Sequence, residues 1–164
     1  MTVKQRLMAF LDNHGIAYTL TTHPTVYTAK ELASAEHVPP HSVAKTVVFL
    51  TESGYGLAVV PADCAVNLEE LRLVLGHSRL RLATEAELAD LFQECELGAM
   101  PPFGDGTLFE LPVYVEEGLA TEKEISFNAG THRDVIHMRF SDFENLVKPK
   151  RIHFARQMTA HTGR

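Results

Sequence analysis

Residues 41–50 read HSVAKTVVFL, a run of β-branched and apolar residues that a single lysine, Lys45, interrupts. Because successive side chains of a strand point to opposite faces, Val47 and Phe49 share the face of Lys45, and the other face is also apolar. Apolar residues on both faces predict a strand that is covered on both sides. A second β-rich run at 56–61 follows the turn residues ESGY, so the two runs predict a hairpin.

Capping boxes mark the starts of several helices. In this device a Ser or Thr side chain caps a backbone N–H and a Glu three residues later reaches back to the first residue. Such boxes or near matches begin at Thr28, Asn67, Thr84 and Ser141. They predict helices from Ala29 to before Pro39 and over 68–76, 85–92 and 142–147.

The remaining elements come from the periodicity of apolar residues. Helical spacing from Val3 to Leu11 predicts an N-terminal helix, and a short extended stretch, IAYTL, follows it. Further strands are predicted at 111–115, 124–128 and 135–140. With 164 residues, the chain is expected to form a single domain over residues 1–164, of the α/β (α+β) class, with a mixed β-sheet flanked by helices.

Composition narrows the class of protein. Hydrophobic residues make up 45% and charged residues 22%, which is typical of a soluble globular protein. No apolar run is long enough to cross a membrane, and the N-terminus does not resemble a signal peptide, so a cytoplasmic location without membrane attachment is expected. Cys64 and Cys95 lack the CxxC spacing, which argues against a disulfide framework and a structural zinc site.

The charge of the chain is unevenly distributed. A formal net charge of -6 argues against a protein that holds nucleic acid through a broad basic surface. From residue 148 onward, however, there are basic residues and no acidic ones: Lys148, Lys150, Arg151, Arg156 and Arg164. This tail is either solvated or a local contact for an anionic partner.

Lys45 itself has two interpretations. Near the end of a strand, a lysine can extend its ammonium to solvent along an apolar surface. Alternatively it opens into a pocket, where burial favours the neutral amine and an anionic ligand or a carboxylate, such as that of Asp63, favours the charged form. The spacing alone does not decide between them.

Two stretches of small residues lie elsewhere in the chain: GAMPPFGDG at 98–106 and NAGTHRD at 128–134. Neither fits a phosphate-binding or dinucleotide-binding glycine motif, and the chain contains neither an H-E-x-x-H pair nor a G-x-S-x-G elbow. Glycines let the backbone approach a ligand and can leave N–H groups directed at an oxyanion. Taken alone, the first stretch is better interpreted as a surface loop and the second as a turn.

Seven segments in order carry a family resemblance: HPTVYTAKELA from His23, VAKTVVFL, LAVVPADCAVNLEEL, LGHSRLRLATEAEL, GAMPPFG, LPVYVEEGL and ISFNAGTHRDVI. Together residues 23–146 resemble the YbaK/ProX family, free-standing relatives of the editing domain inserted in some bacterial prolyl-tRNA synthetases. The resemblance implies a mixed sheet flanked by helices and hydrolysis of mischarged aminoacyl-tRNA in trans. It implies neither a metal nor another cofactor.

The resemblance also implies roles for individual residues. Lys45 falls at the mouth of a small aminoacyl pocket, where it positions substrate, with Val43, Val47 and Phe49 as an apolar floor. Catalysis is then expected from orientation of the substrate and from loop N–H groups, at Gly98 and Gly130, that stabilise the oxyanion. The predicted substrate-binding residues are His23, Tyr27, Thr28, Thr46, Met100, Pro101, Phe103, Gly104, Ala129, Thr131 and His132.

The function predicted on this basis is trans-editing of a small wrong amino acid on tRNA-Pro or a related tRNA. The partners would be the acceptor end of aminoacyl-tRNA and, in addition, an aminoacyl-tRNA synthetase. One alternative is a non-catalytic module that binds aminoacyl-tRNA or a synthetase. Another is a Schiff-base enzyme with Lys45 as nucleophile, which requires a neutral amine near pH 7.

Overall fold

The structure is a computed structural model that describes residues 1–104 and 106–158. Its largest sheet contains β2 (Ala44–Thr51), β3 (Gly54–Pro61), β5 (Leu80–Leu82), β6 (Val113–Glu116) and β9 (Lys150–Ile152). The strand order is β5-β2-β3-β6-β9. The β2–β3 hairpin is antiparallel, whereas β6 pairs in parallel with β3 and β9 pairs in parallel with β6. The mixed sheet and the hairpin predicted from the sequence are therefore confirmed.

Two smaller sheets accompany the large one. The first, in the order β1-β8-β7, contains β1 (Tyr18–Thr22), β7 (Glu124–Asn128) and β8 (Asp134–Arg139). The second pairs β4 (Cys64–Val66) with β10 (Ala155–Gln157). A parallel bridge between Val43 and Ser126 brings the start of β2 beside β7. The three-residue strands β4, β5, β9 and β10 were not predicted, because three residues are too few to show a periodicity.

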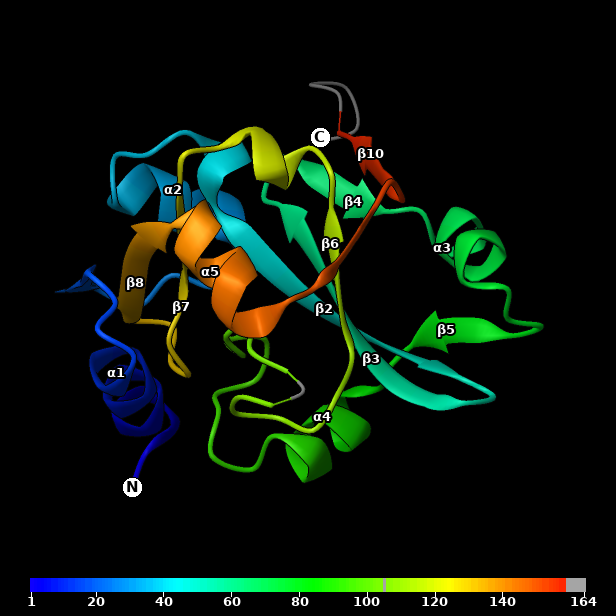
Figure 1. Cartoon of the computed structure of the whole chain (residues 1–164), viewed down its shortest axis with the longest axis horizontal. Coiled ribbons are helices and arrows are strands. Elements are labelled where there is room, and N and C mark those ends of the chain that lie inside the picture. Colours follow the sequence, from blue (N-terminus) through cyan, green and yellow to red (C-terminus); the bar gives the residue numbers. More distant parts are fainter. Residues whose placement is uncertain (105, 159–164) are drawn as a thin grey trace.

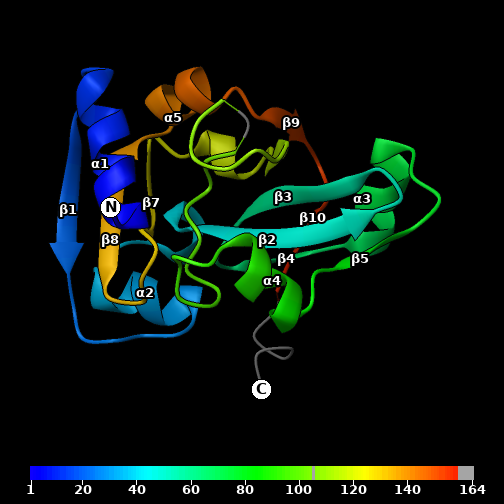
Figure 2. The same cartoon turned by 90° about the horizontal axis from the view of Figure 1, so that it is seen from below.

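The helices lie around these sheets. They are α1 (Val3–Asn13), α2 (Ala29–Ala35), α3 (Leu68–Leu75), α4 (Glu85–Leu91) and α5 (Phe140–Val147), with short 3-10 turns at Pro40–Ser42 and Leu119–Thr121. Figures 1 and 2 show α1 and α2 beside the three-stranded sheet, whereas the long β2–β3 hairpin extends to the other side of the molecule with α3 and β5. None of the helices in the described ranges is long and apolar enough to cross a membrane.

The capping predictions have mixed outcomes. Thr28 and Thr84 form complete capping boxes, and the Asn67 side chain caps α3. The box predicted at Ser141 is wrong, because α5 begins earlier, after Arg139, and has no side-chain cap. Glu144, the expected partner of Ser141, instead accepts from the Arg151 guanidinium at 2.7 Å. Glu144 thus pairs with a residue seven positions further along the chain and not with Ser141.

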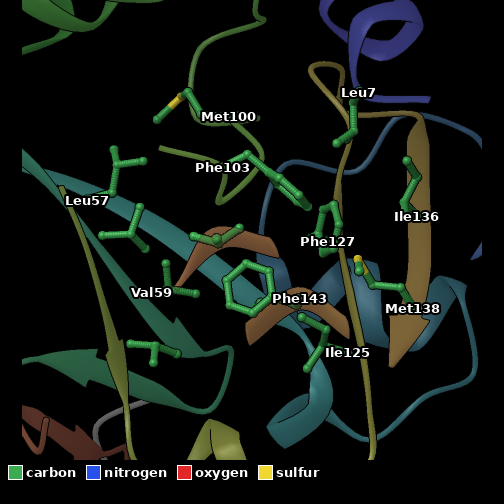
Figure 3. Close-up of a cluster of buried hydrophobic side chains, with 14 of the residues drawn as sticks. Leu7, Leu57, Val59, Met100, Phe103, Ile125, Phe127, Ile136, Met138 and Phe143 are labelled. Atoms are coloured by element: carbon green, nitrogen blue, oxygen red, sulfur yellow. The ribbon is translucent and has the colours of Figure 1, made fainter. Parts of the chain in front are cut away.

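The main core fills the space between the two larger sheets and is rich in aromatic rings (Figure 3). Phe103 is fully buried there, with its ring centroid 5.6 Å from that of Phe127 and 5.7 Å from that of Phe143. Burying a phenylalanine side chain contributes about 1.5 to 3 kcal/mol. Leu7 of α1 and Ile136 of β8 close the same cluster.

A buried carboxylate fixes the course of the chain toward β10. Glu116, at the end of β6, is 3% exposed, and its side chain accepts the backbone N–H groups of Phe154 and Ala155, each at 2.7 Å. It also accepts from the Gly118 N–H at 3.1 Å and faces His153 Nδ1 at 3.0 Å. Glu116 therefore holds the segment that leads into β10.

Replacing Glu116 with glutamine is expected to destabilise the fold by about 1 to 3 kcal/mol at pH 7, because an amide cannot accept from all of these donors. Burial raises the pKa of Glu116, but its hydrogen bonds outweigh burial and hold the pKa below its usual value. The ionised carboxylate thus stabilises the fold above the pKa of the unfolded chain, and this contribution is lost as the pH falls through the folded pKa. The Glu116→Gln variant should therefore lose less stability on acidification than the wild type.

Urea unfolding measured between pH 7 and pH 3 checks this expectation. Exposed Glu117 provides a matched control, since Glu117→Gln makes the same chemical change beside the buried site. Equal unfolding free energies for both variants would contradict the role assigned to Glu116.

Candidate functional site

A cavity of about 460 Å³ opens at the N-terminal end of β2. Separate parts of the chain line it: the start of α2, the start of β2, the loop near Gly98, the end of β7 and the residue that follows β10. Six predicted site residues line it together: Tyr27, Thr28, Lys45, Thr46, Gly98 and Met100. The volume lies within the range of about 300 to 1,000 Å³ that is usual for small-molecule sites.

Local structure explains why these segments meet. The capping box of Thr28 and Glu31 starts α2 at the cavity wall, and the Glu31 carboxylate also accepts the N–H of Tyr27 at 3.1 Å. The Val43–Ser126 bridge brings the first residues of β2 to the last residues of β7. The cavity therefore lies where the two larger sheets approach each other, at strand ends that leave side chains free to face a ligand.

Lys45 faces this cavity, as the resemblance implied. Its Nζ donates a hydrogen bond to the Cys64 carbonyl at 2.8 Å. Burial lowers the pKa of Lys45 and nearby Lys30 lowers it further, whereas Cys64 and Asp63 oppose the shift. Because an ammonium has three donors, two remain available for a ligand. The structure thus favours the pocket interpretation over an ammonium that extends freely into solvent.

The predicted apolar floor of Lys45 is present on the expected face of the strand. Val43 and Phe49 are 1% and 2% exposed, and Val47 is partly buried. Phe49 and Val47 pack in a cluster with Leu71 of α3. This packing fixes the strand from which the lysine extends.

Asp63 lies near Lys45 but is paired with a different residue. Its carboxylate contacts His41 Nδ1 at 2.9 Å, and His41 Nε2 donates to the Gly118 carbonyl at 3.1 Å. Burial lowers the pKa of His41, but Asp63 and Gly118 outweigh burial and raise it above its usual value. The Asp63 carbonyl also accepts the N–H of Met158 at 2.9 Å. Asp63 is therefore held through both its side chain and its backbone carbonyl.

Cys64 is a free thiol, and burial, followed by nearby Asp63, raises its pKa to about 11. A thiol with such a pKa is neutral near pH 7, so it is a poor nucleophile. Ligand atoms of His41, Asp63 and Cys64 lie within 4.8 Å of one another. Both imidazole nitrogens of His41 are engaged by oxygen acceptors, however, and metal binding requires a free ring nitrogen and a thiolate. The cluster suits a structural role.

The loop that contains Gly98 is supported from behind by His132. Gly98 has a φ of +84°, which favours glycine. His132 Nε2 contacts the Leu97 carbonyl at 2.6 Å, and the backbone N–H of His132 donates to the Glu96 carboxylate at 2.8 Å. The His132 ring also lies 5.2 Å from that of Tyr27. His132 therefore contacts residues that line the cavity without lining it itself.

Three predicted residues of the first small-residue stretch lie outside the cavity lining. Phe103 is part of the main core, and Pro101 is buried. Gly104 packs so closely that a Cβ atom there would lie 2.1 Å from the Leu111 carbonyl oxygen. These residues fix the loop in place, whereas Gly98 and Met100 face the cavity.

The predicted residues of the second stretch also contact other parts of the protein. The Gly130 N–H donates to the Ala99 carbonyl at 2.9 Å, so it is already used within the protein. The Thr131 hydroxyl donates to Asp134 at 2.8 Å, and Ala129 is fully buried. The contacts of Gly130 and Ala99 connect the two stretches to each other, and this link positions the Gly98 loop.

His23 also lies away from the cavity lining, with Nδ1 2.7 Å from the Pro24 carbonyl and Nε2 3.8 Å from Glu36. The lining includes three polar or flexible residues that the sequence interpretation did not select: Lys30, Asn128 and Met158. Asn128 is the first residue of the NAGTHRD stretch, and its position at a strand end could have identified it as a site residue. No feature of the sequence identifies Met158, because it reaches the cavity only through the pairing of β10 with β4. Arg164, the last basic residue of the predicted tail, lies outside the described residues.

Several known proteins are similar in sequence to this chain. A curated relative from Escherichia coli (strain K12), the Multifunctional Ser/Thr-tRNA deacylase ProXp-y, is 28% identical over 93% of this chain and 92% of its own length. The Prolyl-tRNA editing protein ProX of Acetoanaerobium sticklandii is 26% identical over 90% of this chain and 92% of its own length. A Proline--tRNA ligase of Thermosipho africanus is 32% identical over 49% of this chain, which is 14% of the ligase.

The fold has a close match among solved structures. A crystal structure of a candidate trans-editing enzyme for prolyl tRNA synthetase superimposes with a TM-score of 0.82 and 25% identity, covering 94% of this chain and 97% of the other. The sequence profile of the family described as Aminoacyl-tRNA editing domain matches residues 23–146. Because this match spans more than half of the chain and includes nearly all of the cavity lining, the protein belongs to the aminoacyl-tRNA editing domain family.

Proposed function

We propose that the protein hydrolyses mischarged aminoacyl-tRNA and releases a small wrong amino acid from the acceptor end of the tRNA. The observation that carries this proposal is the position of Lys45, a partly buried lysine at a cavity of about 460 Å³ in a member of the editing family. Two curated relatives that cover at least nine-tenths of the chain are named as a tRNA deacylase and an editing protein, which supports it.

The geometry suits recognition of an ester that carries negative charge nearby. Lys45 and Lys30 both line the cavity, and among the described lining residues there is no carboxylate. A terminal phosphate of the tRNA or the developing oxyanion would therefore meet positive charge. Met100 and the small residues Ala44 and Ala62 offer an apolar wall for the amino-acid side chain.

The choice of tRNA and partner is also part of the proposal. We expect tRNA-Pro or a related tRNA, because a relative is named for prolyl-tRNA editing and a Proline--tRNA ligase contains a similar segment. A synthetase is a further expected partner, and the cytoplasm, where aminoacyl-tRNA is used, is the expected location. The acidic net charge of -6 fits brief capture of the acceptor end better than tight binding of a whole tRNA.

The test is release of labelled amino acid from tRNA-Pro charged with alanine, serine, threonine or cysteine. Accelerated release from at least one of these is expected, and correctly charged prolyl-tRNA-Pro serves as the matched control that should remain intact. Release of the same amino acids from an unrelated tRNA shows whether the protein recognises the body of the tRNA. Binding without accelerated release from any of these substrates would show a non-catalytic aminoacyl-tRNA module instead.

A further inference from the structure

One face of β10 continues from the wall of the cavity. Met158, the residue after this strand, lines the cavity, and its backbone N–H donates to the Asp63 carbonyl at 2.9 Å. This hydrogen bond continues the ladder between β10 and β4 by one step, so the ladder includes Met158. Because residues two apart in a strand share a face, the Arg156 side chain leaves β10 on the face of Met158, about 7 Å along the strand.

The opposite face of this two-stranded ribbon is packed against the protein. Val66 and Ala155 are register partners, and both pack on the apolar cluster that contains Phe49. The next register pair, Ala65 and Arg156, points the other way, and both residues are exposed. The Arg156 guanidinium therefore faces solvent beside the opening of the cavity, and the small side chain across from it does not cover it.

Arg156 has no side-chain partner in the described part of the chain. Its guanidinium forms no hydrogen bond or ion pair with residues 1–104 or 106–158. Asp63, whose carbonyl extends the ladder, has its carboxylate paired with His41 at 2.9 Å. Three other arginines are each paired with a glutamate: Arg72, Arg81 and Arg151. Among the described residues, Arg156 is thus available for an anion from outside the protein.

Two further cations belong to the same opening. Lys30 and Lys45 both line the cavity, and among its described lining residues there is no carboxylate. Burial lowers the pKa of Lys45, and the charge of Lys30 lowers it further, so the two ammonium groups are close enough to repel each other. A bound anion removes this repulsion. The opening and the adjoining face of β10 together suit a ligand that carries several negative charges.

A strand of nucleic acid has this property. The cavity, of about 460 Å³, has the size of a small-molecule site, so it can hold the aminoacyl ester with the nucleoside that carries it. The preceding nucleotides then remain outside, and their phosphates are the anions that follow the ester along the strand. An arginine matches a phosphate particularly well, because its planar guanidinium donates two parallel hydrogen bonds to the phosphate oxygens.

We propose that Arg156 binds a backbone phosphate of the acceptor strand just outside the cavity, an assignment that rests on the aminoacyl-tRNA substrate proposed above. β10 then contributes twice to binding, since Met158 completes the cavity wall and Arg156 holds the strand that leaves it. A phosphate contact fixes the position of the strand without reading its bases. One such local contact is compatible with the acidic net charge of -6.

The first experiment measures the Kd for tRNA-Pro over a range of salt concentrations, with Arg156→Met and Arg79→Met compared with the wild type. Arg79 is the matched control: it is exposed, its side chain has no partner among the described residues, and it precedes β5, at the other end of the molecule from α2 (Figure 2). Arg156→Met should raise Kd at low salt about 3 to 10-fold. The slope of log Kd against log salt should fall by about 0.7, the value for one contact with a single strand. Arg79→Met should change neither quantity.

The second experiment locates the contact by comparing the hydrolysis of two substrates. Aminoacyl-adenosine contains the same ester but no phosphate, so Arg156→Met should hydrolyse it with the wild-type KM. For aminoacyl-tRNA, KM should rise by the same factor as Kd, with kcat unchanged. Arg156→Lys should recover most of the salt dependence, because it restores the charge, and less of the affinity, because an ammonium lacks the planar fork.

Several outcomes overturn the assignment. Equal effects of Arg156→Met and Arg79→Met would show that only net charge matters. A raised KM for aminoacyl-adenosine would place the action of Arg156 inside the cavity. Unchanged affinity for tRNA in Arg156→Met would mean that this arginine is merely solvated. If the wild type releases no amino acid, the proposed deacylase function fails, yet the binding measurement still decides the role of Arg156. Thermal melts of each variant check that the fold is retained.

Discussion

Replacing Lys45 with methionine is expected to lower kcat/KM for deacylation by about 10² to 10³-fold, the usual cost of removing one group that stabilises developing charge. Methionine keeps an unbranched apolar stem and removes only the ammonium. Lys45 Nζ reaches the Cys64 carbonyl at the cavity, so the change removes positive charge from the site while the strand beneath stays packed. Stability should therefore change little. Release of labelled amino acid under single-turnover conditions measures the effect.

Lys30 provides the matched control, because it lines the same cavity from α2 but is exposed, and its ammonium makes no hydrogen bond or ion pair with residues 1–104 or 106–158. Lys30→Met should lower the rate much less and mainly through KM at low salt, where exposed charges act most strongly. Equal losses in the two variants would mean that net positive charge, and not the placed ammonium, is what the substrate needs. Lys45→Met with full activity would remove the basis of the proposed mechanism.

Replacing Gly104 with alanine is expected to give the largest loss of stability, about 3 kcal/mol, which is the upper end for overpacking a core. A Cβ atom at this position would lie 2.1 Å from the Leu111 carbonyl oxygen and 2.4 Å from Val113 Cγ2. The first neighbour is a backbone atom, which cannot turn away as a flexible side chain can, and the second belongs to the β6 residue Val113. Urea unfolding of Gly104→Ala beside the wild type measures the loss.

Gly118→Ala is the control for this change. Gly118 has a φ of -60°, and a Cβ atom there would meet His41 only at 3.6 Å, which is ordinary contact. This variant should unfold at nearly the wild-type urea concentration. A small effect of Gly104→Ala would show that the loop can yield, and it would return Gly104 to the predicted set of substrate-binding residues. A large effect with unchanged KM in the folded fraction would assign it to packing.

Patterns within a single segment predicted much of this fold. The run at 41–50 is a strand because both its faces are apolar, and Thr28 and Thr84 cap helices because their glutamate partners lie within the same turn. The box predicted at Ser141 did not form, because α5 begins before Ser141, and Glu144 pairs with Arg151, which lies seven residues further along the chain. A competing ion pair alone does not prevent a capping box, because Glu87 completes the box of Thr84 while it also accepts from Arg81 at 2.7 Å. The earlier start of α5 is what removes Ser141 from the cap position.

The sequence predicted part of the candidate site. Lys45 stands out because it is charged within an apolar strand, whereas Thr46 and Gly98 were predicted through the family resemblance. Phe103 was predicted in the same way, yet it packs in the core, because the sequence of a loop does not show which way its side chains turn. Met158 could not be found at all, since only the pairing of two three-residue strands brings it to the cavity.

Met158 lies far along the sequence from the other residues that line the cavity, and this separation has a consequence during synthesis of the chain. The family match ends at residue 146, and the other lining residues all lie before that point. Because a domain generally folds as a unit, a nascent chain that still lacks β10 also lacks this part of the cavity wall. The cavity is complete only after β10 has been made and has paired with β4.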